Sequence, residues 1–227
     1  IEVMGGIHPA REYVLAALKS GKHVVTSNKE LIADSLDELV SNAQKNNVSL
    51  LFEAAVGGGI PILGALRDHL AANEIHEVFG IVNGTTNYIL SKMTEEHREF
   101  ADVLAEAQQK GFAEANAKKD LQGDDAVNKA VILAAMAFGA KAEASGVYRE
   151  GIEKITREDI EYAGEIGYTI KLLAIVRLVG KQLELRVHPA LVSKNHPLSS
   201  VSENNNAIYV TGSPVGSLMF YGPGAGG

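Results

Sequence analysis

The sequence predicts an α/β fold followed by an α+β fold: a partial Rossmann-type parallel sheet, then a larger part with a mixed or antiparallel sheet and helices on one face. Two observations carry this prediction. Short β-branched runs alternate with helical segments up to about residue 55, which predicts parallel strands joined by right-handed crossovers. Beyond that point the alternation stops, and several strand-like runs follow one another near the end of the chain. We therefore expect a change of domain near residue 55.

The first part contains two expected helices, two expected strands and the end of a further strand at Glu2–Met4. A proline at the start and Gly21 after the end bound a helix over Pro9–Ser20. The run His23–Ser27 is rich in β-branched residues and predicts a strand. A second helix over Leu36–Asn46 and a second strand over Ser49–Val56 complete the alternation.

The second part is read from apolar periodicity and from glycines that end segments. We expect helices over Pro61–Ala72, from Tyr88 to Met93 and beyond, and over Phe100–Lys110, Ala126–Phe138 and Arg157–Leu173. We expect strands over Glu77–Val82, Leu173–Val179, Gln182–Pro189, Ala207–Val210 and Leu218–Tyr221.

Composition excludes several classes of protein. The 227 residues contain no cysteine, so disulfides, thiolate catalysis and zinc–thiolate sites are excluded. The net charge is −7 without a basic run, so we expect no nucleic-acid partner. No apolar run reaches the length of a membrane span, so we expect no membrane association. The absence of cysteine fits a cytoplasmic location.

Four charged residues, Glu114, Asp120, Asp125 and Lys129, lie in one short stretch before the apolar run Ala130–Phe138. Asp125 and Lys129 are four residues apart, so they share one face of a helix. Three carboxylates and one amine at the start of an apolar element can bind an amino acid and tune a lysine that donates a proton. The alternative is an ordinary solvated helix start, because acidic residues suit the positive end of the helix dipole.

A second lysine follows a predicted strand. Lys29 lies in the stretch Thr26-Ser27-Asn28-Lys29-Glu30, and in an open parallel sheet ligands bind at the carboxyl ends of strands. Lys29 could therefore face a cofactor or substrate. The alternative is a lysine in the first turn of a surface helix.

A dense polar cluster, Asn83–Asn87 (NGTTN), lies between an apolar strand and an apolar helix. Thr86 or Asn87 can act as a helix cap, and the other polar groups can line a pocket for a cofactor or substrate. The two interpretations remain equally supported by the sequence.

Two glycine-rich segments have weaker signals. Gly57, Gly58 and Gly59 allow backbone carbonyls to turn toward a hard cation such as Na⁺ or K⁺, although a tight turn before Pro61 explains them more simply. The end of the chain, 222–227 (GPGAGG), matches G-x-G-x-x-G in form only, because a dinucleotide fingerprint needs a following helix.

Taken together, these motifs resemble those of the homoserine dehydrogenase family. In order, they are TSNKELIA at 26–33, FEAAVGGGIPIL at 52–63, VNGTTNYIL at 82–90, GFAEAN at 111–116, DLQGDDAVNKAVILA at 120–134, and NAIYVTG with MFYGPGAGG within 206–227. The likeness covers nearly the whole chain, and the motifs NGTTNYIL and GxDxxxKxxILA in this order are very specific.

The resemblance implies an NAD(P)-dependent oxidoreductase that interconverts L-aspartate 4-semialdehyde and L-homoserine in threonine and methionine biosynthesis. It implies that Lys129 is the general acid/base, that Lys29 is a second catalytic lysine and that Asp120 supports Lys129. The residues implied for substrate binding are Glu114, Asp125, Thr86 and Gly84, and those implied for cofactor binding are Thr26, Ser27, Lys29, Gly111 and Gly226. The residues implied for binding Na⁺ or K⁺ are Glu53, Val56, Gly58 and Ile60.

The resemblance also implies the division of the chain. Residues 1–55 correspond to the C-terminal portion of a nucleotide-binding domain, residues 56–215 to a catalytic and dimerisation domain, and residues 216–227 to a segment that returns to the first domain. A homodimer through the catalytic domain is expected. The phosphate-binding loop is expected upstream of Ile1, so we expect the 227 residues alone to be inactive.

Two alternatives stay open. The chain could be a non-catalytic dimerisation or binding module with this fold. It could also belong to a related semialdehyde or amino-acid dehydrogenase. If the chain belongs to a related dehydrogenase, the acidic pair Glu114 and Asp125 favours an amino-acid substrate.

Overall fold

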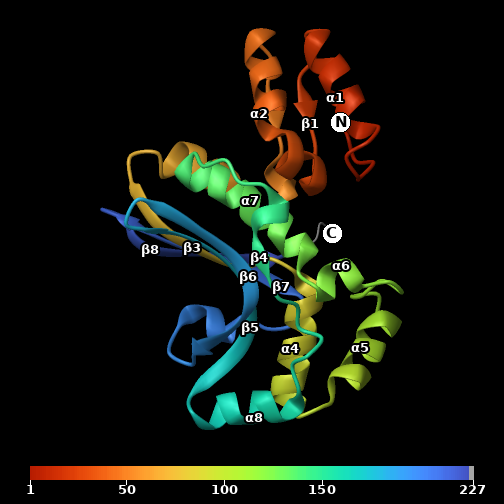
Figure 1. Cartoon of the computed structure of the whole chain (residues 1–227), viewed down its shortest axis with the longest axis vertical. Coiled ribbons are helices and arrows are strands. Elements are labelled where there is room, and N and C mark those ends of the chain that lie inside the picture. The colour runs from red at the N-terminus through yellow and green to blue at the C-terminus, as the bar shows by residue number, and fades with distance from the viewer. Residues whose placement is uncertain (225–227) are drawn as a thin grey trace.

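The computed structural model describes residues 1–224. The molecule is elongated, with the N-terminal elements at one end and helix α8 (Arg157–Glu165) at the other (Figure 1). The expected α/β part followed by an α+β part is confirmed, because a small parallel sheet comes first and a six-stranded sheet follows.

The N-terminal part joins two helices to a parallel sheet. Strands β1 (Val24–Val25) and β2 (Leu50–Leu51) pair in parallel, and Glu2 forms a parallel bridge to Thr26. Helices α1 (Ala10–Lys19) and α2 (Lys29–Lys45) pack against each other beside this sheet.

Two boundaries in this part differ from the prediction. Helix α2 begins at Lys29 rather than at Leu36, because the Asn28 side chain accepts a hydrogen bond from the Leu31 amide and caps the helix. Ser35 has non-helical dihedral angles, so α2 is kinked just before the predicted start of the helix. The predicted strand Ser49–Val56 is shorter, since a 3₁₀ turn η1 (Glu53–Ala55) follows β2.

The second sheet has the order β4-β6-β5-β3-β7-β8. All neighbouring strands are antiparallel except β4 and β6, so the sheet is mixed. The strands are β3 (Glu74–Ile81), β4 (Tyr148–Arg149), β5 (Tyr168–Val179), β6 (Gln182–Ser193), β7 (Asn205–Ser213) and β8 (Gly216–Pro223).

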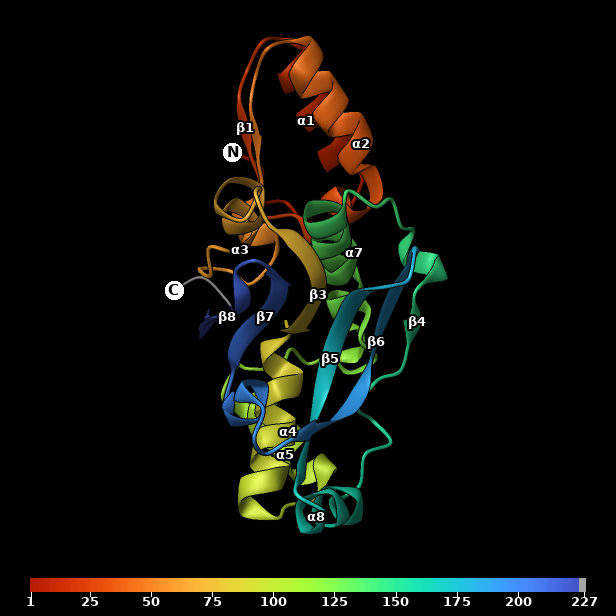
Figure 2. The same ribbon diagram turned by 90° about the vertical axis from the view of Figure 1, so that its left-hand side faces the viewer.

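Helices cover one face of this sheet. Helices α4 (Gly84–Glu96), α7 (Asp124–Phe138) and α8 pack on the strands, and α5 (Phe100–Gln109) packs on α4. Figure 2 shows the strands in front of α4 and α5. The remaining helical pieces are short: α3 (Ile62–Gly64), the π-helical turn η2 (Ala65–His69), α6 (Lys118–Leu121), and the 3₁₀ turns η3 (Ala144–Gly146) and η4 (Pro197–Ser200). No helix in the described part of the chain is both long and apolar enough to cross a membrane.

The prediction of one helix over Arg157–Leu173 is wrong. The helix ends at Glu165, and strand β5 begins at Tyr168. Gly167 between them has a φ of +85°, a left-handed conformation that ends the helix and that glycine adopts at low cost.

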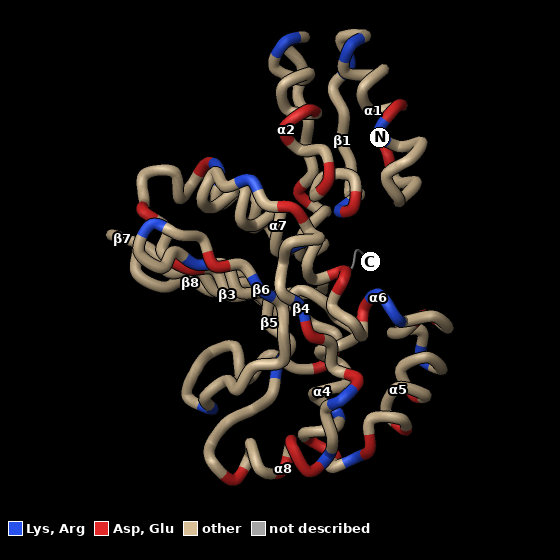
Figure 3. The backbone as a smooth tube through the Cα atoms, in the orientation of Figure 1, with Lys and Arg blue, Asp and Glu red and all other residues tan. Residues whose placement is uncertain are grey.

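The main hydrophobic core lies between the helices and the sheet and continues into the N-terminal part. A smaller cluster on the opposite face of the sheet includes Ile81, Leu173 and Leu198, the last from η4. Acidic and basic residues are interspersed along the chain, and both signs occur where α2 approaches α7 (Figure 3). The N-terminal part and the large sheet therefore meet through α2 and α7, which is where the candidate site lies.

Candidate active site

Three segments that are distant in the sequence meet at the start of helix α7. Strand β3 ends at Ile81 and delivers the Val82 carbonyl and the Asn83 side chain. Helix α7 contributes Asp125 and Lys129 from its first two turns, and α2 contributes Lys29, its first residue. The packed helix and strand ends fix all of these groups relative to one another.

Asp125 is the centre of the site. Its side chain is 7% exposed, and its two oxygens bind two different lysines: Lys129 Nζ lies 2.7 Å from Oδ2, and Lys29 Nζ lies 2.9 Å from Oδ1. Burial alone would raise the pKa of Asp125, but the two ammonium groups and the Asn83 amide lower it well below its usual range. A buried carboxylate is therefore held ionised between two amines.

Lys129 is buried but keeps one donor for a ligand. Its ammonium group donates to the Val82 carbonyl at 2.6 Å and to Asp125 Oδ2 at 2.7 Å. A lysine ammonium has three N–H donors. Because the other two are fixed by protein acceptors, the third has a defined direction.

Lys29 is more accessible, with 40% of its side chain exposed. Burial lowers its pKa, but the Asp125 charge and hydrogen bond outweigh burial, so the pKa is raised overall. The Lys29–Asp125 ion pair joins the N-terminal part of the molecule to α7. Next to it, Glu30 pairs with Lys119 at 2.7 Å.

The sequence prediction missed Asn83 as a site residue. Its amide nitrogen donates to Asp120 Oδ1 at 2.8 Å and to Asp125 Oδ2 at 2.9 Å. Its side-chain oxygen caps α4 by accepting from the Thr86 amide at 2.9 Å. The local signal was present, because an asparagine between a strand and a helix is typical of a cap.

Asp120 is linked to the lysines indirectly, because Asn83 donates to both Asp120 and Asp125. Burial raises the pKa of Asp120, the Asn83 hydrogen bond lowers it, and the nearby Asp125 charge raises it, so that the overall shift is upward. Only one of its oxygens is occupied by Asn83.

Glu114 does not join the cluster. It lies on the exposed loop 111–116, and within residues 1–224 its carboxylate has no hydrogen-bond or ion-pair partner. The structure therefore brings together Lys29, Asp120, Asp125 and Lys129 and leaves Glu114 apart.

Gly84 and Thr86 lie in the first turn of α4. A Cβ on Gly84 would lie 2.8 Å from the carbonyl oxygen of Asn204, so close packing requires glycine here. The Thr86 hydroxyl donates to the Asn83 side-chain oxygen at 3.0 Å. Within the described chain, no acceptor binds the amides of Gly84 and Thr85, which point out of the helix start.

Two of the residues predicted for the cofactor, Ser27 and Lys29, line a second, smaller cavity. This cavity has a volume of 220 Å³ and is lined by residues 3–6 and 27–30, including Ser27 and Lys29. The Thr26 hydroxyl donates to Glu2 Oε2 at 2.6 Å and accepts from the Asn28 amide at 2.9 Å. Gly111 ends α5 with a φ of +75°. Gly226 lies outside the described residues.

The loop predicted for a monovalent cation is a tight turn. The Glu53 carboxylate accepts from the amides of Leu63 and Gly64, each at 2.7 Å. The Ile60 carbonyl accepts from the Ile62 amide at 2.8 Å. The carbonyls of Val56 and Gly58 accept no hydrogen bond from a described residue.

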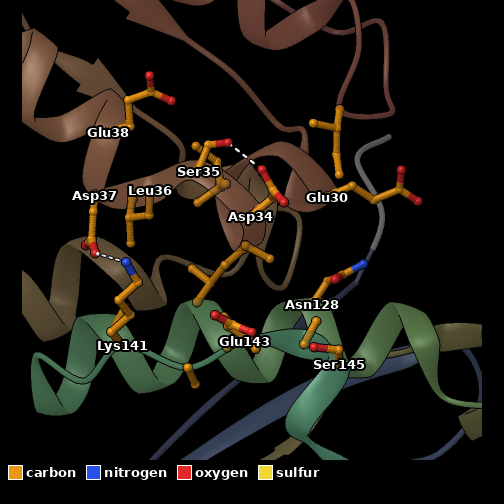
Figure 4. Close-up of a pocket in the computed structure, with 18 of the residues that line it drawn as sticks. Glu30, Asp34, Ser35, Leu36, Asp37, Glu38, Asn128, Lys141, Glu143 and Ser145 are labelled. Carbon is orange, nitrogen blue, oxygen red and sulfur yellow. Dashed lines mark hydrogen bonds and ion pairs between the residues drawn. The ribbon is translucent and has the colours of Figure 1, made fainter.

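A larger cavity of 750 Å³ lies between α2 and α7 (Figure 4). It is lined by both signs of charge, and Lys141 bridges it to Asp37. Lys29, Asp125 and Lys129 do not line it, so it is distinct from the lysine–carboxylate cluster.

Comparison with known proteins identifies the family. The family model described as homoserine dehydrogenase matches residues 61–227, and the model of the NAD-binding domain of the same family matches residues 1–53. The chain belongs to the homoserine dehydrogenase family. The resemblance inferred from the motifs is thereby confirmed.

Individual relatives agree. A homoserine dehydrogenase from Neisseria gonorrhoeae is 50% identical over 226 residues, which cover 100% of this chain and 52% of the relative. A crystal structure of a homoserine dehydrogenase from Thiobacillus denitrificans has a TM-score of 0.97 at 49% identity, covering 99% of this chain and 52% of that chain. A hyperthermophilic archaeal homoserine dehydrogenase mutant in complex with NADPH has a TM-score of 0.84 at 33% identity, covering 99% of this chain and 66% of that chain. The chain thus spans about half the length of the curated relatives it matches.

Proposed function

We propose that the protein containing this chain is an NAD(P)-dependent oxidoreductase that interconverts L-aspartate 4-semialdehyde and L-homoserine, a step of threonine and methionine biosynthesis. One observation carries the proposal: two lysine ammonium groups bind the two oxygens of one buried, ionised carboxylate, Asp125. Such a cluster stabilises negative charge that develops on a substrate oxygen and can supply its proton.

The residues around the smaller cavity fit a nicotinamide cofactor. The cavity lies where the chain leaves the Glu2 bridge and strand β1, which is the carboxyl end of the small parallel sheet. Ligands of open α/β sheets bind at this end. When bound there, the cofactor supplies the hydride chemistry. Ser27 and Lys29 line the cavity and would hold it, with Thr26, Gly111 and Gly226 as further expected contacts.

Lys129 acts as the general acid/base in this proposal. In the reduction, its third N–H donates a proton to the aldehyde oxygen of the semialdehyde, which becomes the hydroxyl of homoserine. In the oxidation, the neutral amine accepts the proton of that hydroxyl. The Val82 carbonyl and Asp125 orient the amine for this transfer. Lys29 adds a second positive charge beside the same oxygen. Asp120 contributes to the field around both amines.

The substrate's amino-acid groups fit the remaining polar surface. Glu114 offers a carboxylate with no partner among residues 1–224, and together with Asp125 it would bind the substrate ammonium group. The unoccupied amides at the start of α4, at Gly84 and Thr85, suit the substrate carboxylate, because a helix N-terminus attracts anions. Thr86 orients Asn83, which in turn fixes Asp125.

We extend the proposal to a monovalent cation, Na⁺ or K⁺, at the turn 53–60. The free carbonyls of Val56 and Gly58 support it, with the Ile60 carbonyl and Glu53 as the other expected ligands. A homodimer through the catalytic domain, the division at residues 55 and 215, and a cytoplasmic location remain predictions.

The test compares lysine variants in a version of the protein that spans the full length of its relatives. Lys129→Met should lower the rate of semialdehyde reduction by about a hundredfold or more, because positioned proton transfer contributes roughly 10²–10⁴. The control is Lys141→Met, which removes an exposed ion pair across the other cavity and should retain the wild-type rate. Wild-type-like reduction by Lys129→Met would exclude Lys129 as the acid/base.

The same experiment separates the alternatives. A wild-type protein that reduces no semialdehyde but still dimerises would indicate a binding or assembly module. A wild-type protein that prefers another amino-acid semialdehyde would indicate a related dehydrogenase on the same scaffold.

A further inference from the structure

The loop that carries Glu114 begins at a single glycine. Gly111 follows α5 with a φ of +75°, a left-handed conformation that glycine adopts at low cost. Two amides just after it, those of Phe112 and Ala113, donate to the Ala107 carbonyl at 2.9 and 3.1 Å. Since the Glu114 carboxylate has no partner among residues 1–224, its position depends on what holds this turn.

The two residues that flank Gly111 contact the same buried side chain, Tyr88 of α4. Tyr88 is 1% exposed, and its ring lies 4.8 Å from the ring of Phe112, measured between centroids. On the other side of the glycine, the ammonium group of Lys110 donates to the Tyr88 hydroxyl oxygen at 3.1 Å. One side chain therefore contacts the turn from both directions.

A carboxylate completes this network. The Tyr88 hydroxyl donates to Glu106 Oε1 at 2.6 Å, and Arg98 pairs with the other oxygen of Glu106. Hydrogen bonds from Lys110, Tyr88 and Arg98 lower the pKa of Glu106 to about 2, so the carboxylate is ionised at neutral pH. Burial, followed by the Glu106 hydrogen bond, raises the pKa of Tyr88, so its hydroxyl stays protonated as the donor.

The backbone of the turn is tied to the same helix. The Thr85 hydroxyl donates to the Phe112 carbonyl at 2.7 Å. Thr85 lies two residues after Asn83, the cap that binds Asp120 and Asp125. The start of α4 thus contacts both the carboxylate cluster and the turn that precedes Glu114.

We propose that Tyr88 is a positioning residue that fixes the Gly111 turn from both sides and thereby limits the positions open to Glu114 on the loop that follows. This inference rests on the proposed function in one respect, namely that Glu114 binds the substrate ammonium group. In the described chain, Tyr88 forms no hydrogen bond with Lys29 or Lys129, and it does not line the cavity at Ser27.

Amide hydrogen exchange tests the positioning directly, in the full-length protein that carries this chain. Tyr88→Phe keeps the ring against Phe112 but removes the hydroxyl that binds Lys110 and Glu106. The amides of Phe112 and Ala113 should exchange about tenfold faster, because a hydrogen bond to a charged group is lost. The matched control is Tyr148→Phe, which removes an exposed hydroxyl–carboxylate hydrogen bond to Glu150 and should leave these amides unchanged.

Steady-state kinetics tests the consequence. Tyr88→Phe should raise KM for homoserine by about three- to tenfold and change kcat by less than about twofold, since binding of the substrate is affected rather than proton transfer. Tyr88→Leu, which also removes the ring, should raise KM further.

The outcomes separate the two proposals. Unchanged exchange at Phe112 and Ala113, or an unchanged KM with faster exchange, overturns the positioning role. A wild-type protein that does not turn over homoserine overturns the proposed function, and the exchange experiment still decides whether Tyr88 fixes the turn.

Discussion

Helix α4 borders two buried lysine ammonium groups with different surroundings. Near its first turn, Lys129 is 9% exposed and shares the Asp125 carboxylate with the amide of the cap Asn83. One turn later, Asn87 lies beside Lys171, which is 2% exposed. Lys171 donates to the Val201 carbonyl at 2.6 Å, to Asn87 Oδ1 at 3.2 Å and to the Ser91 hydroxyl at 3.4 Å, all of them neutral acceptors.

The difference between the two lysines lies in their acceptors, one a carboxylate and the others neutral. Burial lowers the pKa of Lys171 to about 8, and the Glu95 charge opposes this only in part. At Lys129 the ionised carboxylate of Asp125 compensates the positive charge. Both amines are fixed by hydrogen bonds, but only the first pairs with a carboxylate and has an accessible second lysine, Lys29, beside it.

The largest effect should come from removing the shared carboxylate. Asp125→Asn leaves the buried Lys129 ammonium without its ionised partner, so we expect a loss of about 3–5 kcal/mol in the free energy of unfolding. Urea denaturation at neutral pH measures it. The neighbouring variant Asp124→Asn, which removes a partly exposed ion pair with Arg149, should cost less than about 1 kcal/mol. Equal stability of Asp125→Asn and wild type would show that Asp125 does not compensate the Lys129 charge.

The second prediction concerns the pH dependence caused by Lys171. In the unfolded chain this lysine has its ordinary pKa of 10.5, and in the folded protein burial lowers the pKa to about 8. Between these values the unfolded state binds more protons, so stability rises as the pH increases from about 8 to about 10.5. The gain should be about 3 kcal/mol, from 1.36 kcal/mol per pKa unit.

The variant Lys171→Met isolates this contribution, because other groups titrate in the same range. The difference in unfolding free energy between wild type and Lys171→Met should grow with pH in this window. The charge of Glu95 opposes the effect of burial on the pKa of Lys171. If the unfolding free energies of the two proteins changed with pH in parallel, the lowered pKa of Lys171 would be contradicted.

A third, smaller effect concerns the contact between the start of α4, at Gly84, and the loop that contains Asn204. Asn87 donates to the carbonyls of Val201, Glu203 and Asn205, and so holds the loop whose Asn204 carbonyl abuts Gly84. Gly84→Ala places a Cβ 2.8 Å from that carbonyl oxygen and should cost about 1–3 kcal/mol by overpacking.

Thermal unfolding measures the cost, with Gly146→Ala as the control. Gly146 has no heavy atom within 4 Å of an added Cβ and no positive φ, so its substitution should be nearly neutral. If both variants melt at the same temperature as wild type, the loop does not pack tightly on the start of α4.

The sequence predicted the local parts of this comparison. Spacing of four residues placed Asp125 and Lys129 on one helix face. The polar run at the start of α4 indicated a cap, but the prediction placed it at Thr86 or Asn87, and the structure places it at Asn83. Most strand and helix types followed from periodicity. The exceptions are the 3₁₀ turn at 53–55, the short strand β4, and residues 157–173, where apolar residues on both sides of Gly164 and Gly167 concealed the change from helix to strand.

Long-range pairings could not be predicted from local pattern. Lys29 pairs with Asp125 only because α2 packs on α7. Asn83 can bind Asp120 and Asp125 only when the end of β3 lies beside α6 and the start of α7. Lys171 lies within an apolar strand, and nothing in that strand indicates that its amine meets α4 and the Val201 carbonyl. These contacts depend on tertiary packing, which overrides local preference.

The smallest effect comes from a lysine that has a carboxylate partner but no burial. Lys141 pairs with Asp37 at 3.3 Å across the larger cavity, with side chains 77% and 70% exposed. Water screens this pair, so Lys141→Met should change the free energy of unfolding by less than about 0.5 kcal/mol, and raising the salt concentration to about 1 M should remove even that difference. Urea denaturation at low and high salt measures it. Lys129 is buried beside a carboxylate, Lys171 is buried among neutral acceptors, and Lys141 is exposed beside a carboxylate. Variants of the three lysines therefore separate the effect of burial from the effect of the acceptor's charge. A loss of about 2 kcal/mol or more at Lys141 would mean that the N-terminal part and α7 are coupled through this cavity as strongly as through Lys29 and Asp125.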